Sequence, residues 1–111
     1  QLVPQPVTNI NINALQGYAK TSVVTVTTTL TKLPSYGQLF NRRSLMVYNN
    51  SSTVTLYIGG SDVTASNGFP VPPNSYSPAF DAGYNMIIYG ITSSGSCETR
   101  VVELSNESIG R

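Results

Sequence analysis

Short runs of β-branched and aromatic residues, separated by turn residues, follow one another from Ser22 to Leu104 and constrain the fold more than any other feature. Branched side chains suit a pleated strand, and no stretch long enough for a substantial helix lies between the runs. We therefore predict an all-β protein, either a small β-sandwich of the jelly-roll or immunoglobulin-like type or a small barrel. The predicted strands are 22–31, 42–49, 53–59, 75–80, 85–91 and 97–104.

Apolar alternation and proline positions indicate how some of these strands are arranged. The runs 42–49 and 53–59 both alternate, and only a short Asn- and Ser-rich turn separates them, so we predict that they pair as an antiparallel hairpin. The run 85–91 is almost continuously apolar, which is typical of a central strand. Pro78 has no backbone N–H group, so the strand 75–80 is predicted at a sheet edge.

The first 20 residues differ from the rest of the chain. Early prolines prevent a regular start, and Ile10 and Ile12 alternate with asparagines in a way that suits an extended segment. We predict an extended N-terminal arm at 1–20, followed by a β-sandwich domain at 21–111. Within the arm, the predicted contacts with a partner are Ile10, Ile12 and Tyr18. A frayed chain end is the alternative interpretation.

The predicted strand 22–31 is rich in threonine and nearly free of charge. An edge strand with these properties is prone to pair with other strands. We therefore expect a partner subunit, or the 1–20 arm of a neighbouring copy, to cover this strand by adding a strand of its own.

Composition excludes several classes of function. The chain has no His, which is the commonest general base and metal ligand, and its formal net charge of +1 leaves no basic patch for nucleic acid. No apolar run approaches the roughly 20 residues of a membrane-spanning helix. We therefore expect no enzymatic activity, no cofactor or metal ion, and neither a nucleic-acid nor a membrane partner. Because the first residue is Gln rather than Met, we also expect a processed chain or a part of a longer product.

Few side chains carry chemistry that would contradict this expectation. Asp62 and Asp81 fall in predicted loops, where a glycosidase-like carboxylate pair or a calcium site is conceivable, but both positions are typical of ordinary turns. Cys97 is the only cysteine, and because the chain has no histidine to activate it, we predict a buried, apolar role.

Contacts with a partner are predicted at three further positions. Phe69 lies in the proline-rich loop 68–73, and an aromatic side chain on a stiff loop loses little entropy when it docks. Arg42 and Arg43 form the only adjacent basic pair. Both are candidate contacts with an acidic patch on a partner, but we favour the interpretation that one of the two is a solvated residue at the start of a strand.

The tyrosines near predicted turns allow two interpretations. Tyr36, Tyr76 and Tyr84 can stack against sugars, or they can fill the core and protein interfaces, where tyrosine supplies a large and stiff surface. We favour the second interpretation, and the first stays open.

A series of motifs runs through the C-terminal part of the chain. After Arg43 they are LMVYNN (45–50), LYIGGSDVT (56–64), NGFPV (67–71), IYGI (88–91), SG (94–95) and RVVEL (100–104). On these motifs, the segment 42–104 resembles a small β-sandwich module of tailed-bacteriophage virion proteins, which occurs in capsid decoration (cement), head-fibre and tail-associated proteins. Asn74 follows Pro73 where the module has glycine, and asparagine also tolerates a left-handed turn.

The resemblance implies a structural role in a virion. We expect a capsid decoration protein on the outer surface of the phage head, which binds the major capsid protein through its arm and β domain. We also expect a homo-oligomer, with a trimer favoured. The alternatives are a head-fibre or tail module that recognises a host surface glycan, and an immunoglobulin-like domain of a bacterial extracellular protein. The module itself does not decide among these roles, because one fold serves several of them.

Overall fold

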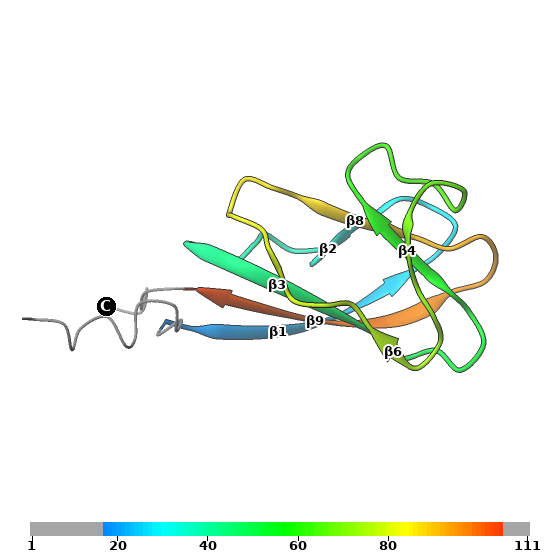
Figure 1. Ribbon diagram of the computed structural model, residues 1–111, viewed down its shortest axis with the longest axis horizontal. Coiled ribbons are helices and arrows are strands. Elements are labelled where there is room, and N and C mark those ends of the chain that lie inside the picture. Colours follow the sequence, from blue (N-terminus) through cyan, green and yellow to red (C-terminus); the bar gives the residue numbers. More distant parts are fainter. Residues whose placement is uncertain (1–16, 106–111) are drawn as a thin grey trace, which may run out of the picture.

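Two antiparallel β-sheets face each other in the computed structural model, which describes residues 17–105 (Figure 1). Sheet A contains β1 (Ala19–Val26), β3 (Arg42–Asn49), β6 (Ser75–Tyr76), β7 (Phe80–Asp81) and β9 (Cys97–Ser105), and sheet B contains β2 (Thr31–Leu33), β4 (Leu56–Gly59), β5 (Phe69–Val71) and β8 (Ile88–Ile91). The order in sheet A is β1–β9–β3–β6, with β7 also paired to β3, and the order in sheet B is β2–β8–β4–β5. This arrangement confirms the predicted all-β fold and its β-sandwich form.

The predicted strand 22–31 is in fact two strands, which lie in different sheets. β1 ends at Val26, and the chain then crosses to sheet B, where β2 begins at Thr31. Threonine side chains stabilise the crossing: the Thr27 hydroxyl accepts a hydrogen bond from the Thr29 N–H at 3.1 Å, and the Thr31 hydroxyl donates to the Thr29 carbonyl at 2.9 Å. Such local side-chain bonds compete with strand pairing, so a continuous β-branched run can still contain a break.

The N-terminal boundary of the sandwich lies slightly earlier than predicted. β1 begins at Ala19, and Ala19 is paired with Leu104 near the end of β9. The start of β1 and the end of β9 therefore meet at one end of the sandwich (Figure 1). The predicted contacts Ile10 and Ile12 lie outside the described residues.

The predicted hairpin of 42–49 with 53–59 is wrong. β3 pairs with β9, β6 and β7 in sheet A, whereas β4 pairs with β5 and β8 in sheet B. The Asn49 side chain holds this change of sheet, since its Nδ2 group donates to the Val54 carbonyl at 2.8 Å and to the Val71 carbonyl at 2.9 Å. The turn after β3 therefore links the two sheets and does not close a hairpin.

Two other predictions of strand position are confirmed. The apolar run 85–91 contains β8, which begins at Ile88 and lies between β2 and β4. The segment 75–80 lies at the edge of sheet A, where Pro78 falls in the gap between β6 and β7. In that gap the Ser77 N–H donates to the Val47 carbonyl at 2.8 Å, and the Ser77 hydroxyl accepts a hydrogen bond from the Val47 N–H at 3.1 Å.

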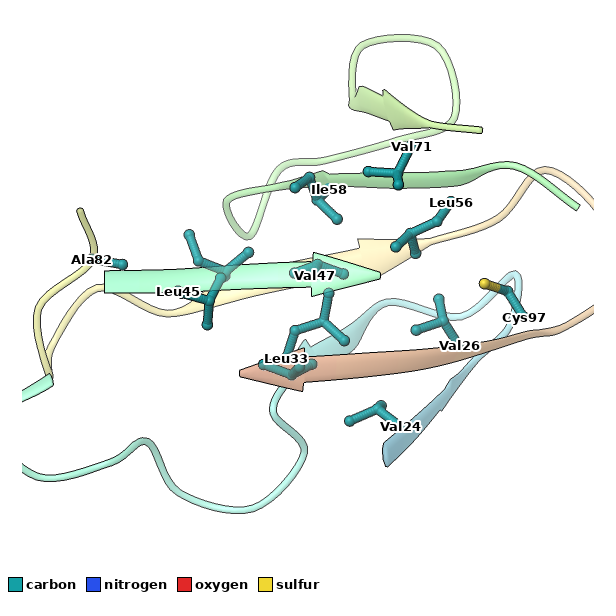
Figure 2. Close-up of a cluster of buried hydrophobic side chains, with 12 residues drawn as sticks. Val24, Val26, Leu33, Leu45, Val47, Leu56, Ile58, Val71, Ala82 and Cys97 are labelled. Carbon is teal, nitrogen blue, oxygen red and sulfur yellow. The ribbon is translucent and has the colours of Figure 1, made fainter. Parts of the chain in front are cut away.

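Alternate strand residues fill the space between the sheets (Figure 2). In β3, Leu45 and Val47 are buried, whereas Met46 and Tyr48 lie partly exposed on the outer face, as the alternation predicts. The same alternation leaves Val23 of β1 58% exposed. The other main contributors to the core are Val24, Val26, Leu33, Leu56, Ile58, Val71, Ile88, Cys97 and Val101.

Candidate functional site

An apolar groove opens between the two sheets, on the side where sheet A ends at the β6–β7 edge. The groove has a volume of about 310 Å³. No charged or polar side chain lines it, so it suits apolar side chains of a partner better than a sugar or an ion. Its lining residues are Ile58, Gly59, Phe69, Pro78, Phe80 and Ile88.

Phe69 is an exposed aromatic side chain of this groove that can anchor a partner. It lies directly opposite Ile58 in the β4–β5 ladder, so both side chains project from the face of sheet B that is turned toward the core. Ile58 is buried, but Phe69 remains 53% exposed beside the groove that Pro78 and Phe80 of the sheet A edge also line. Phe69 is therefore a core-facing aromatic side chain that the protein itself leaves uncovered.

Phe69 begins strand β5, which corrects the prediction that it lies in a loop, and close packing fixes the loop that precedes it. A β-carbon on Gly68 would lie 2.6 Å from Cβ of Tyr57 and 2.8 Å from Cγ2 of Val63, so only glycine lets the loop approach β4 this closely. The Asn67 side chain adds a local bond, since its Oδ1 accepts from the Thr64 N–H at 2.7 Å. This packing presents Phe69 on a preorganised backbone, which lowers the entropic cost of docking.

Arg42 forms a buried ion pair, which corrects the prediction that it contacts a partner. Its Nη1 lies 2.8 Å from Oε2 of Glu103, and both side chains are fully buried. Its Nε donates to the Ala82 carbonyl at 2.7 Å, and Nη2 donates to the carbonyls of Gly83 and Met86. Arg42 therefore fastens the loop after β7 to strands β3 and β9 and is not available at the surface.

The other predicted contacts that the structure describes are exposed and lie apart from the groove. Arg43 is exposed at the start of β3, and Tyr18 is 42% exposed just before β1. Arg43 belongs to sheet A and Tyr18 immediately precedes its strand β1, whereas Phe69 belongs to sheet B. The described contacts thus do not form one surface.

Asn49 is a buried polar residue whose structural role the sequence analysis missed. Besides its two bonds to the carbonyls of Val54 and Val71, its Oδ1 accepts from the Ser51 N–H at 2.9 Å and from the Cys97 Sγ–H at 2.9 Å. Its amide group therefore uses both of its donors and both acceptor positions. In the sequence, Asn49 begins an Asn/Ser turn cluster, so its pattern indicates a turn and gives no sign of a bond between sheets.

Cys97 is buried, as predicted, although it also donates to Asn49. Burial raises the pKa of the Cys97 thiol, the nearby Glu98 carboxylate adds to the rise, and the Thr99 hydroxyl opposes it. The thiolate is thus less stable in the folded protein than in the unfolded chain. The resulting stabilisation is present below the ordinary thiol pKa of about 8.5 and is lost as the pH rises through the raised pKa of the folded state.

We expect the Cys97 thiol to react slowly with an aromatic disulfide reagent in the native protein and rapidly in denaturant, because the thiol must first leave the core. The measurement is the absorbance of the released thiolate at pH 8, with and without denaturant. Equal rates in the two conditions would show that the thiol is accessible in the folded protein.

The three tyrosines near turns are all at the surface. Tyr36 is 84% exposed, Tyr76 69% and Tyr84 47%, so the prediction that they fill the core is wrong and only a role at a surface remains. Tyr84 packs edge-on against exposed Phe40, with ring centroids 5.8 Å apart. Tyr76 pairs with Tyr48 near the end of β3, while the loop of Tyr84 follows β7 near the start of β3. Tyr76 and Tyr84 therefore lie in two different regions.

Within residues 17–105, no three Cys, Asp or Glu side chains come together as a group that could hold a metal ion. Asp62 lies in the loop after β4 and Asp81 at the end of β7. In the same part of the chain, no helix is long and apolar enough to cross a membrane.

No protein-family model, curated protein or solved structure matches this chain. Function must therefore be inferred from the side chains themselves.

Proposed function

We propose that this chain is a non-enzymatic virion protein that decorates the outer surface of a phage head, with the major capsid protein as its partner. The observation that carries the proposal is Phe69, an aromatic side chain at the mouth of an apolar groove that no other described residue covers. Aromatic side chains are enriched at the centres of protein interfaces, so an exposed phenylalanine beside an apolar groove suits a protein partner. The resemblance of the segment 42–104 to a virion module supplies the identity of that partner.

The proposed mechanism is stabilisation by mass action. A ligand that binds only the assembled shell shifts the equilibrium toward assembly, and many equivalent copies together produce avidity. One or two apolar side chains of the major capsid protein would enter the groove beside Phe69. Only 10% of the residues are charged, so this contact depends little on salt.

A second candidate is a head-fibre or tail module that binds a host surface glycan. The observation in its favour is the exposed aromatic pair of Phe40 and Tyr84, since sugars stack against such rings. A glycan array distinguishes the two candidates, because only the second predicts saturable binding to a carbohydrate.

Replacing Phe69 by Ala should weaken capsid binding at least about tenfold, because aromatic anchors in apolar sites dominate interface energies. The thermal midpoint should change little, since half of this side chain is already in water. The measurement is co-pelleting of the full chain with bare capsids of the source virus over a range of concentrations. Phe40→Ala is the matched control, as Phe40 is 57% exposed but lies outside the groove.

Each outcome of this experiment has a distinct meaning. If no version pellets with capsids, the decoration role is wrong. If Phe40→Ala weakens binding and Phe69→Ala does not, the protein docks through the other aromatic region. A further version lacking residues 1–16, which leaves β1 complete, measures the contribution of the segment that contains Ile10 and Ile12.

A further inference from the structure

Three of the four sheet edges in the described chain are blunted against further strand pairing. β2 is only three residues long, and β5 contains Pro70, which has no N–H to donate. The β6–β7 edge of sheet A is broken into two short strands around Pro78. These are the usual devices by which β-proteins avoid pairing with other chains.

β1 forms the fourth edge, and its one protective feature is a single charged side chain. It is eight residues long, contains no proline and forms a regular ladder with β9 through its whole length. Its only charged residue is Lys20, whose Nζ lies 3.4 Å from the Gly37 carbonyl oxygen. The edge that the fold leaves open is therefore also its longest and most regular edge.

The hydrogen-bond pattern shows which backbone groups of β1 face this open edge. The Ser105 N–H donates to the Tyr18 carbonyl at 2.9 Å, so residue 18 and every second residue after it direct their backbone groups toward β9. The N–H and C=O groups of the intervening residues point away from β9, and no other strand of the described chain pairs there. These outward-directed residues are Ala19, Thr21, Val23 and Thr25.

We propose that the β1 edge pairs antiparallel with β1 of a second copy of this chain, about a two-fold axis at Ser22. In this register the outward backbone groups of Thr21 meet those of the partner's Val23, and those of Ala19 meet the partner's Thr25. All of the outward N–H and C=O groups of β1 are then paired. Sheet A continues across the axis into the sheet of the second copy.

The Ser22 hydroxyl favours this register. Its oxygen is buried and has no hydrogen-bond partner among the described residues, and native proteins leave few buried polar atoms in that state. Ser22 lies at the two-fold axis as a non-hydrogen-bonded pair, in which facing Cα atoms are about 4.5 Å apart. Two facing hydroxyls at that separation can donate and accept with each other after a change of side-chain rotamer.

The charges of β1 also suit a second copy. With the axis at Ser22, Lys20 faces the partner's Val24, and the two lysines lie about 13 Å apart along the strands. The two lysines therefore do not face each other directly, which avoids the destabilising effect of like charges on opposite strands. On the outer face, the exposed Val23 lies opposite the partner's Thr21, which is a favourable β-branched pair.

This inference goes beyond the capsid role and does not depend on it. A two-fold pairing makes a dimer, in place of the trimer that the sequence analysis favours. The dimer carries two Phe69 grooves, one on each copy, so it can bind a repetitive surface at two points.

The first test is the molecular mass of the full chain in solution, measured by sedimentation equilibrium over a concentration series. We expect a dimer, at twice the 11.9 kDa mass of the chain. Thr21→Pro removes an N–H that only the second copy would use, and it should shift the mass to that of the monomer. Thr21→Ala, which keeps the N–H, should remain a dimer.

Two results would overturn the proposal: a wild-type chain that stays a monomer or forms a trimer, or a folded Thr21→Pro protein that remains a dimer. Hydrogen exchange on the wild type keeps the proposal testable if Thr21→Pro does not fold. The amides of Thr21 and Val23 should exchange as slowly as those of Val24, which is bonded to β9. Slow exchange of these amides in a monomer would show that the chain's own residues cover the β1 edge, and it would contradict the proposed dimer.

A cysteine pair tests the register itself. Ser22→Cys should oxidise to a covalent dimer, because facing residues at the axis bring the two sulfur atoms within disulfide reach. Lys20→Cys is the matched control, since that residue faces the partner's Val24 and should give little covalent dimer. Equal yields from both variants would contradict the register. Capsid co-pelleting is measured separately from the mass in solution. A monomer that pellets with capsids would contradict the dimer but not the decoration role, and a dimer that does not pellet would contradict the decoration role but not the dimer.

Discussion

Replacing Arg42 by Met should lower the free energy of unfolding by about 3–5 kcal/mol, because it leaves the Glu103 carboxylate buried without its cation. Both side chains of the pair are fully buried, and Nη1 lies 2.8 Å from Oε2. The Arg42 side chain also satisfies the carbonyls of Ala82, Gly83 and Met86, which would lose their donor. The measurement is urea unfolding followed by circular dichroism.

The exposed pair of Arg100 and Glu98 is the matched control. Its Nη2 and Oε2 atoms are 2.7 Å apart, but the two side chains are 54% and 44% exposed. Arg100→Met should therefore cost less than about 1 kcal/mol. The double variant Arg42→Met with Glu103→Leu should recover part of the loss, since it removes both charges. Equal costs for Arg42→Met and Arg100→Met would contradict the structural role of the buried pair.

Replacing Asn49 by Asp should lower the free energy of unfolding by about 3 kcal/mol or more, although the two side chains have nearly the same shape. The Nδ2 group donates to the carbonyls of Val54 and Val71, and a carboxylate oxygen at that place would face both carbonyls without a proton. Buried acceptors that lose their donors cost about 1–3 kcal/mol each, and a buried charge adds to this cost.

The neighbouring Asn50 gives a matched control, because its side chain is exposed. Asn50→Asp should change the free energy of unfolding by no more than about 0.5 kcal/mol. Chemical unfolding of both variants under the same conditions gives the comparison. An Asn49→Asp protein as stable as Asn50→Asp would show that the bonds between the sheets contribute little.

The sequence predicts which face of a strand is buried better than it predicts which strand is its neighbour. Leu45 and Val47 point inward as the alternation requires, since the pattern reports burial directly. The same pattern contains no information on pairing, so it predicts a hairpin of two adjacent alternating runs that the structure does not contain. The Asn49 side chain instead holds the chain where it passes from sheet A to sheet B, through bonds to residues that follow it by 5 and by 22 positions.

The candidate site was predictable only in part. Phe69 stands out in the sequence because it interrupts a proline-rich loop, and the structure places it at the edge of an apolar groove. The groove itself is also lined by Pro78 and Phe80 at the edge of the other sheet, and only the folded protein brings them beside Phe69. Arg42 looked like a surface charge because its partner Glu103 is 61 residues away, and only the folded sheet brings them together.

The position of β9 between β1 and β3 sets the order in which the protein can be completed during synthesis. β1 and β3 emerge from the ribosome early, but the strand that joins them is the last strand of the described chain. Until it arrives, both strands expose unpaired backbone groups on sides that are covered in the finished sheet. Pairing between such distant segments is slow, so the nascent chain passes through a period in which it needs protection from other nascent chains.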